Sequence, residues 1–195
     1  MIRIAVLIGG SGRSLKNLID LQDEHGRLWG EARIQCVVAH KETVLGLKYA
    51  TEYGIPHTWG WLNVYPFLES HGVDLVVMAG WIKKLPIPKK WANRVMNIHP
   101  ALLPAFGGKG MYGRYVHQAV IESGAKFSGC TVHYADGEYD HGPIILQRLV
   151  PVLENDTPEA LAARVFEQEK LAYPEAIRMH VEGKLFVQGR RVIKN

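Results

Sequence analysis

The first hundred residues alternate between segments rich in valine and isoleucine and segments with the periodicity of an amphipathic helix. This alternation predicts parallel strands joined by crossover helices. The expected strands cover residues 2–8, 34–39, 73–79 and 95–98, and the expected helices cover residues 14–25 and 44–53. Residues 73–79 form an almost continuous apolar run, which is typical of a strand buried on both faces. We therefore expect an α/β fold with a doubly wound, mostly parallel sheet flanked by helices.

The second half of the chain follows a different pattern. A glycine-rich loop (residues 104–113) and a short helix (115–123) precede two strand-like runs, 129–134 and 143–150, which we expect to form an antiparallel pair. Thr157-Pro158-Glu159 then has the chemistry of a helix start, and this long C-terminal helix is expected to run to about Val181. A terminal hairpin follows over residues 184–194. Because no linker interrupts the pattern, we expect a single domain over residues 1–195.

Composition excludes several classes of function. The chain of 195 residues has 23 Lys and Arg against 19 Asp and Glu, and its basic residues are scattered, so nucleic-acid binding is not expected. Its longest apolar stretch, residues 75–82, is far shorter than the ~18 residues that span a bilayer. The N-terminus reads as a buried strand instead of a secretion signal, which predicts a cytoplasmic protein. Cys36 and Cys130 lack metal-ligand spacing, so we expect reduced thiols and no metal site.

A glycine-rich turn follows the first strand, and it is a candidate anion site. In Gly9-Gly10-Ser11-Gly12-Arg13-Ser14, glycines let the backbone approach an anion, Arg13 adds a charge, and Ser14 is placed to cap the next helix. The spacing is not a full dinucleotide-binding motif, because Leu15 occupies the third glycine position. An ordinary tight turn remains the alternative.

Polar residues at two later turns are candidate catalytic groups. Asn97 and His99 lie two residues apart at the end of a strand, so their side chains are expected on one face. A carboxylate such as Asp140 beside His99 would raise the pKa of the imidazole. Spacing alone equally allows His99 to be a satisfied structural histidine, and it favours a turn former at Asp140 and a satisfied core histidine at His133. Glu169 is by itself an ordinary solvated helix residue.

Four segments together carry a resemblance to a known family. They are Val6-Leu7-Ile8-Gly9-Gly10-Ser11-Gly12, Met78-Ala79-Gly80-Trp81, Asn97-Ile98-His99-Pro100-Ala101-Leu102-Leu103-Pro104 and Asp140-His141-Gly142-Pro143-Ile144-Ile145-Leu146-Gln147. In order and spacing the chain resembles the phosphoribosylglycinamide formyltransferases of purine synthesis over residues 2–185. The resemblance implies the formyltransferase fold and transfer of a formyl group from 10-formyltetrahydrofolate to the amine of phosphoribosylglycinamide, without a metal.

The resemblance also implies roles for individual residues. Asn97 would donate to the formyl oxygen, His99 would act as the protonated acid, and Asp140 would keep that histidine charged. Substrate-binding residues would be Gly12, Arg13 and Ser14 at the phosphate, Glu169 at the ribose, and His133 behind the reacting centre. The folate would lie among Ile82, Lys83, Lys84, Leu85, Asp136, Gly137, Glu138, Tyr139 and Asp140. Residues 107–113 resemble a mobile active-site loop, whose glycines would permit closure.

Three other functions compete with this interpretation. Arg13 departs from the small polar residues usual in the family, which leaves room for another amine acceptor such as an amino sugar nucleotide. A formyltetrahydrofolate hydrolase would share the catalytic trio, but those enzymes carry an additional domain ahead of the catalytic one, and this chain starts at the first strand. A non-enzymatic nucleotide-binding module would fit the glycine turn and leave Asn97, His99 and Asp140 unexplained. The partners expected are small-molecule substrates, and the sequence does not indicate the oligomeric state.

Overall fold

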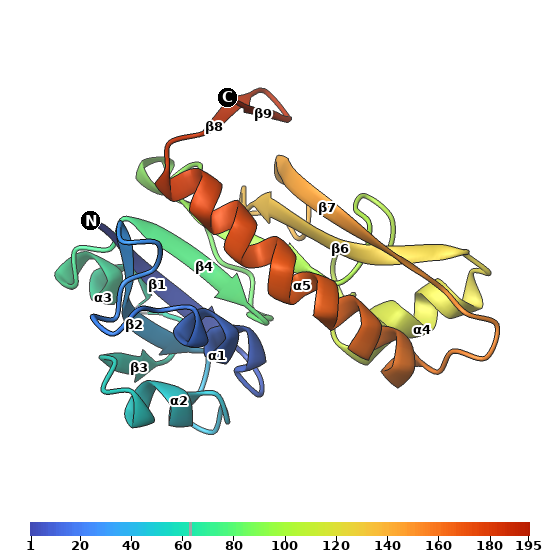
Figure 1. Cartoon of the computed structure of the whole chain (residues 1–195), viewed down its shortest axis with the longest axis horizontal. Helices are drawn as coiled ribbons and strands as arrows, with labels where there is room; N and C mark the ends of the chain where they lie inside the picture. Colours follow the sequence, from blue (N-terminus) through green and yellow to red (C-terminus); the bar gives the residue numbers. More distant parts are fainter. Residues whose placement is uncertain (63) are drawn as a thin grey trace. The chain divides into compact units, whose positions relative to one another are not determined.

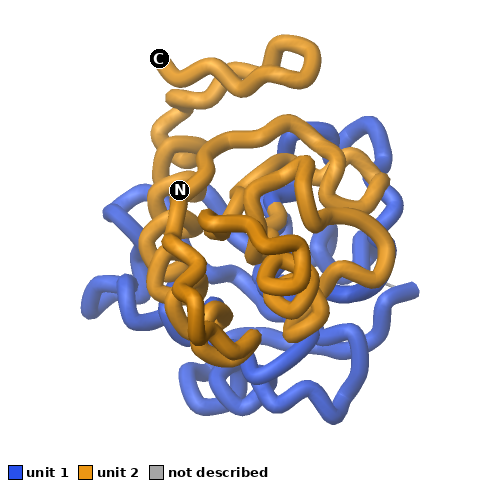
Figure 2. The backbone as a smooth tube through the Cα atoms, turned by 90° about the vertical axis from the view of Figure 1, so that its right-hand side faces the viewer, with its two compact units in different colours: residues 1–96 blue, residues 97–195 orange. Residues whose placement is uncertain are grey.

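A computed structural model describes residues 1–62 and 64–195 of the chain (Figure 1). The chain divides into two compact units, residues 1–96 and 97–195 (Figure 2). The expectation of one domain over residues 1–195 stays a prediction.

The first unit is built on a parallel sheet. β1 (Ile2–Ile8) pairs in parallel with β2 (Ala32–Ala39) on one side and with β4 (Leu75–Ala79) on the other, and β3 (His57–Trp59) pairs with β2. All of β4 is buried, as its apolar run predicts. The connecting segments include α1 (Arg13–Asp20), α2 (Leu47–Glu52), α3 (Val64–Ser70) and the 3₁₀ helix η1 (Lys89–Trp91). The doubly wound parallel arrangement predicted from the alternation is confirmed.

Three details of this unit differ from the prediction. Helix α1 ends at Asp20 instead of residue 25, because the Asp23 carboxylate accepts the backbone N–H groups of His25 and Arg27 and so favours a turn over the helix. Strand β3 was not predicted, since its three residues are too short and too exposed to show an apolar pattern. Helix α3 was not predicted either, because it has only seven residues, of which two are buried.

Strand β5 (Val95–His99) carries the chain into the second unit, where an antiparallel pair dominates. β6 (Phe127–Tyr134) and β7 (Ile144–Pro151) pair antiparallel from Phe127↔Pro151 to His133↔Ile144, with an irregularity in register between Val132 and His133. This confirms the predicted pair. The hairpin of β8 (Leu185–Gln188) and β9 (Arg191–Lys194) joins this sheet where Ile144 of β7 pairs with Arg191.

Two helices complete the second unit. α4 (Arg114–Glu122) follows the glycine-rich loop, and α5 (Pro158–Val181) packs along β6 and β7 (Figure 1). The helix start predicted at Thr157 is confirmed, because the Thr157 side chain accepts the N–H of Ala160 at 3.2 Å and Pro158 occupies the first turn. The apolar side of α5, including Leu161, Val165 and Ala176, is fully buried. Among the described residues, no helix combines the length and apolarity needed to cross a bilayer.

Candidate active site

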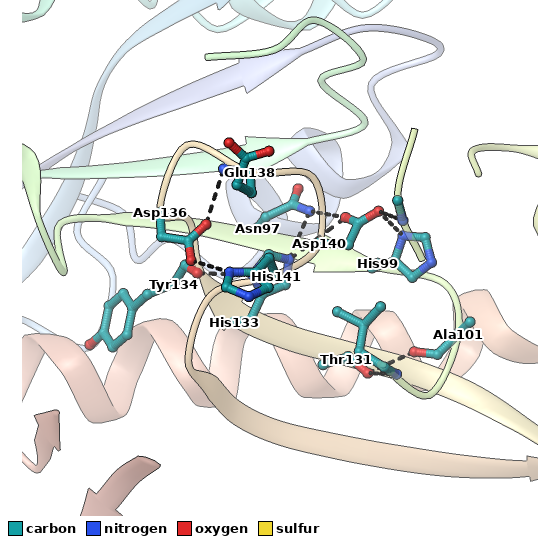
Figure 3. Close-up of polar contacts among 12 residues, drawn as sticks. Asn97, His99, Ala101, Thr131, His133, Tyr134, Asp136, Glu138, Asp140 and His141 are labelled. Atoms are coloured by element: carbon teal, nitrogen blue, oxygen red, sulfur yellow. Dashed lines mark hydrogen bonds and ion pairs between the residues drawn. The ribbon is translucent and has the colours of Figure 1, made fainter. Parts of the chain in front are cut away.

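Four side chains from three segments of the second unit meet at one point (Figure 3). Asn97 and His99 stand at the end of β5, His133 near the end of β6, and Asp140 in the loop between β6 and β7. Both Asn97 and His99 contact Asp140, which agrees with the expectation that alternate residues of a strand share a face. The loop between the antiparallel strands therefore returns to the end of β5.

The Asn97 amide nitrogen lies between two acceptors. Nδ2 is 3.1 Å from Nε2 of His133 and 3.3 Å from Oδ1 of Asp140. His133 places its other ring nitrogen, Nδ1, 2.9 Å from the carbonyl oxygen of Tyr134, so Nδ1 carries the hydrogen and Nε2 accepts. His133 is 1% exposed, so both of its ring contacts are shielded from water. This arrangement fixes which end of the Asn97 amide faces Asp140.

Both ring nitrogens of His99 face oxygen acceptors. Nε2 lies 2.8 Å from the carbonyl oxygen of Phe106, and Nδ1 lies 3.4 Å from Oδ2 of Asp140. A neutral imidazole has only one N–H, so it leaves one of these oxygens opposite a lone pair. Only the doubly protonated ring donates to both. The geometry around His99 therefore favours the imidazolium form.

Burial acts against that charge. His99 is 3% exposed, and burial lowers its pKa below the ordinary value of 6.5, although the charge of Asp140 and the hydrogen bond to Phe106 both raise it. The sequence predicted only the effect of the carboxylate. The net direction is the opposite one, because removing the ring from water outweighs its favourable contacts.

Asp140 is held as a carboxylate by its neighbours. Burial alone would raise its pKa, but the contacts with His133, His99 and the backbone N–H of Gly108 together lower it below 3.8. The Gly108 N–H donates to Oδ2 at 2.9 Å. Asp140 itself has a φ of 52°, a backbone conformation that residues other than glycine seldom adopt. A Cβ at the neighbouring Gly107 would lie 2.5 Å from Leu103 Cδ2 and 3.1 Å from Asp140 Cβ, so a side chain there would force one of these groups to shift.

A second polar network supports the segment that follows β5. The buried Thr131 hydroxyl donates to the Ala101 carbonyl at 2.7 Å and accepts the Leu103 N–H at 3.0 Å. Gln147 on β7 donates to the same hydroxyl and to the Leu103 carbonyl. These contacts fix the chain between His99 and the glycine-rich loop. Gln147 falls in a segment that carried the family resemblance, but nothing in the sequence indicated the partners of either side chain.

His117 on α4 is a further buried group near the site that sequence reasoning missed. It is 4% exposed, its Nδ1 has no hydrogen-bond partner, and burial followed by the charge of His99 lowers its pKa to about 4. His117 is therefore neutral at physiological pH. A histidine on the buried side of a short helix gives no signal of this kind in the sequence.

The other predicted site residues lie in both units. Gly12 is the N-cap of α1 with a φ of 78°, and a Cβ there would lie 2.5 Å from the Cα of Gly46. The prediction that Ser14 caps α1 is wrong, because the helix already begins at Arg13 and no side chain caps it. Arg13 is exposed, Ser14 and Glu169 are half-buried, and Leu85 alone is buried among residues 82–85. Asp136, Glu138 and Tyr139 are exposed in the loop that carries Asp140, and Gly137 there is half-buried.

The profile of the formyl transferase family matches residues 63–177, which is more than half of the chain. The chain belongs to the formyl transferase family. Within the described residues, no group of three or more His, Cys, Asp or Glu side chains is placed to hold a metal ion in this formyl transferase.

Individual relatives of known name share more than a third of their aligned residues with this chain. The chain is 38% identical over 196 residues to the chloroplastic phosphoribosylglycinamide formyltransferase of Vigna unguiculata, which covers 94% of this chain and 62% of that relative. It therefore spans a little under two thirds of that plant protein. Because the plant relative is chloroplastic, a cytoplasmic location for this chain stays a prediction.

Solved structures match over the full chain. Glycinamide ribonucleotide transformylase 1 from Symbiobacterium toebii shows 40% identity and a TM-score of 0.87, covering 100% of this chain and 94% of that one. A phosphoribosylglycinamide formyltransferase from Anaplasma phagocytophilum shows 33% identity and a TM-score of 0.88 with the same coverage. The predicted formyltransferase fold is thereby confirmed.

Proposed function

We propose that this formyl transferase moves the formyl group of 10-formyltetrahydrofolate to the amine of phosphoribosylglycinamide. The observation that carries the proposal is the meeting of Asn97, His99 and Asp140 in one unit, with both nitrogens of His99 facing acceptors. An amide donor and an ionisable ring held by a carboxylate are the groups that acyl transfer through an oxyanion requires. The names of the relatives point to formyl transfer and to the same acceptor.

The proposed reaction is a direct transfer. The substrate amine attacks the formyl carbon, a new C–N bond forms, and the carbonyl oxygen becomes an oxyanion. The bond from that carbon to N10 of the folate then breaks, and N10 takes up the proton that the amine loses. Asn97 Nδ2 and the His99 imidazolium donate to the oxyanion, and such donors each contribute ~2.7–4 kcal/mol to lowering a barrier.

Substrate entry requires some existing contacts to give way. The Asn97 and His99 contacts to Asp140, at 3.3 Å and 3.4 Å, are long for hydrogen bonds to a carboxylate. A formyl oxygen that replaces either one costs less than breaking the 2.8 Å bond between His99 and Phe106. In this proposal the Phe106 carbonyl keeps its hydrogen bond with His99 Nε2, and His99 Nδ1 donates to the substrate. His133 keeps the Asn97 nitrogen turned toward the site.

The remaining roles are proposals of the same kind. Gly12, Arg13 and Ser14 bind the substrate phosphate, supported by the left-handed Gly12 at the start of α1 and the exposed Arg13. Glu169 binds the ribose hydroxyls. Residues 82–85 and 136–140 bind the folate, which serves as a cosubstrate and not as a resident cofactor.

The proposal is tested by incubating the purified chain with 10-formyltetrahydrofolate and one of three acceptors: phosphoribosylglycinamide, an amino sugar nucleotide, or water alone. Formylated product and free tetrahydrofolate are measured together. We expect product only with phosphoribosylglycinamide, and no turnover by a folded His99→Ala variant. Preference for the amino sugar nucleotide would replace the acceptor, and rapid release of tetrahydrofolate without an amine would indicate a hydrolase. No turnover with any acceptor would refute the enzyme assignment.

A further inference from the structure

The turn of the C-terminal hairpin reaches the loop that carries Asp140. Arg190 lies between β8 and β9, and its guanidinium makes two short contacts with one residue of that loop. Nη1 is 2.6 Å from Nε2 of His141, and Nη2 donates to the His141 carbonyl oxygen at 2.9 Å. These contacts join positions 49 residues apart in the sequence.

The contact with Arg190 fixes the hydrogen positions on His141. A guanidinium only donates, so Nε2 of His141 must accept, and the ring hydrogen is then on Nδ1. Nδ1 lies 2.6 Å from Oδ2 of Asp136, which accepts that hydrogen (Figure 3). The other Asp136 oxygen accepts the backbone N–H of Glu138 at 3.1 Å. A continuous chain of hydrogen bonds thus runs from Arg190 through His141 and Asp136 to the loop backbone.

The position of this chain links it to the candidate site. His141 follows Asp140 directly, and Arg190 binds the carbonyl that orients the next peptide. Asp140 occupies a left-handed conformation that its surroundings must maintain. Backbone pairing of Ile144 with Arg191 fixes the hairpin just beyond the loop. The hairpin therefore contacts the His141 end of this segment directly and reaches Asp136 through the His141 ring.

We propose that Arg190 is a positioning residue. The C-terminal hairpin holds residues 136–141 in the conformation that binds the formyl donor and orients the Asp140 carboxylate toward Asn97 and His99. The part about the donor rests on the proposed function, whereas the part about the loop does not. Because all three side chains are partly exposed, their contacts add little to global stability. Their effect is local, since a functional group must be held within about 0.5 Å of its working position.

Hydrogen exchange tests the structural part without any substrate. Removing the two contacts in Arg190→Ala is expected to speed amide exchange over residues 137–141 by about tenfold, given the usual strength of such hydrogen bonds. Arg190→Lys keeps the charge but has no planar fork, so it is expected to behave like Arg190→Ala. Arg191→Ala is the matched control, because it removes the same charge from the neighbouring residue and leaves the backbone pairing intact. Unchanged amide exchange over residues 137–141 in Arg190→Ala, or exchange as slow as wild type in Arg190→Lys, would contradict the proposal that Arg190 holds this loop.

Steady-state kinetics and binding test the functional part. We expect Arg190→Ala to raise KM for 10-formyltetrahydrofolate and the Kd of tetrahydrofolate by about tenfold, with KM for the amine substrate within twofold of wild type and an unchanged melting temperature. Equal increases in both KM values would show a general defect and would overturn the positioning role. If the wild-type chain transfers no formyl group, the proposed function fails, and the exchange experiment still decides whether Arg190 holds the loop.

Discussion

Replacing Asp140 by asparagine keeps the size of the side chain and removes its charge. Oδ2 of Asp140 faces His99 at 3.4 Å and the Gly108 N–H at 2.9 Å, while Oδ1 faces the Asn97 amide at 3.3 Å. If the asparagine oxygen takes the Oδ2 position, its nitrogen faces the Nδ2 donor of Asn97. In the other orientation that nitrogen faces the Gly108 donor. Either orientation therefore loses at least one contact as well as the charge.

The size of the effect follows from the separation of the charges. Two unit charges 3.4 Å apart attract by about 5 kcal/mol at an effective dielectric of about 20. Solvent screening is weak here, because the His99 and Asp140 side chains are 4% and 10% exposed. If about half of this attraction is present in the transition state, its loss slows turnover by roughly 10²-fold. Misplacing Asn97 adds to the loss, so we expect a fall of roughly 10²–10³-fold.

The assay measures formyl transfer to phosphoribosylglycinamide together with the titration of His99 by NMR. Because the Asp140 charge raises the pKa of His99, the Asp140→Asn variant should lower that pKa further. Asp20→Asn serves as a control, since Asp20 is exposed at the end of α1 and pairs with Lys16. Turnover within tenfold of wild type, or a higher pKa of His99 in the variant, would refute the assigned role of Asp140.

Four further substitutions test other parts of the argument. His99→Ala should abolish measurable transfer while the melting temperature shows a folded chain; residual transfer above a hundredth of wild type would contradict its role. Arg13→Ala should raise KM for the amine substrate with kcat nearly unchanged. A KM equal to that of wild type would place Arg13 away from the phosphate. Thr131→Val leaves the buried Leu103 N–H without its acceptor, so urea unfolding should show a loss of about 2–3 kcal/mol; a loss below about 0.5 kcal/mol would contradict this. The pKa of His117 is about 4 in the folded chain and 6.5 in the unfolded chain, so the unfolded state binds the proton first and stability falls as pH drops from 6.5 to 4. His117→Gln should reduce that fall in urea titrations at several pH values, and an unchanged pH dependence would show that other groups cause it.

The elements predicted correctly are those whose signal is local. The apolar run of β4 and the helix start at Thr157-Pro158 depend on neighbouring residues, and both were predicted near their observed positions. Strand β3 was missed because its three residues pair at the sheet edge without an apolar pattern of their own. The early end of α1 also has a local cause, but it depends on one side chain, Asp23, competing for backbone N–H groups.

The candidate site was predictable in its side chains and not in its backbone partners. Asn97 and His99 stand out because two polar groups alternate at a strand end, and the family resemblance drew attention to Asp140. The Phe106 carbonyl and the Gly108 N–H that complete the site are backbone groups, which every residue possesses, so no residue type marks them. The contact between Arg190 and His141 was equally hidden, because it joins two exposed residues through a hairpin whose docking depends on tertiary pairing.

Burial and hydrogen bonding act in opposite directions on the pKa of His99. The two acceptors around the ring favour the imidazolium, whereas the loss of water favours the neutral form and lowers the pKa below 6.5. A formyl oxygen that takes the place of Asp140 at Nδ1 gains negative charge as the reaction proceeds, so its contact with the charged ring strengthens toward the transition state. A group whose charge is favoured only in the transition state lowers the barrier without tightening substrate binding equally.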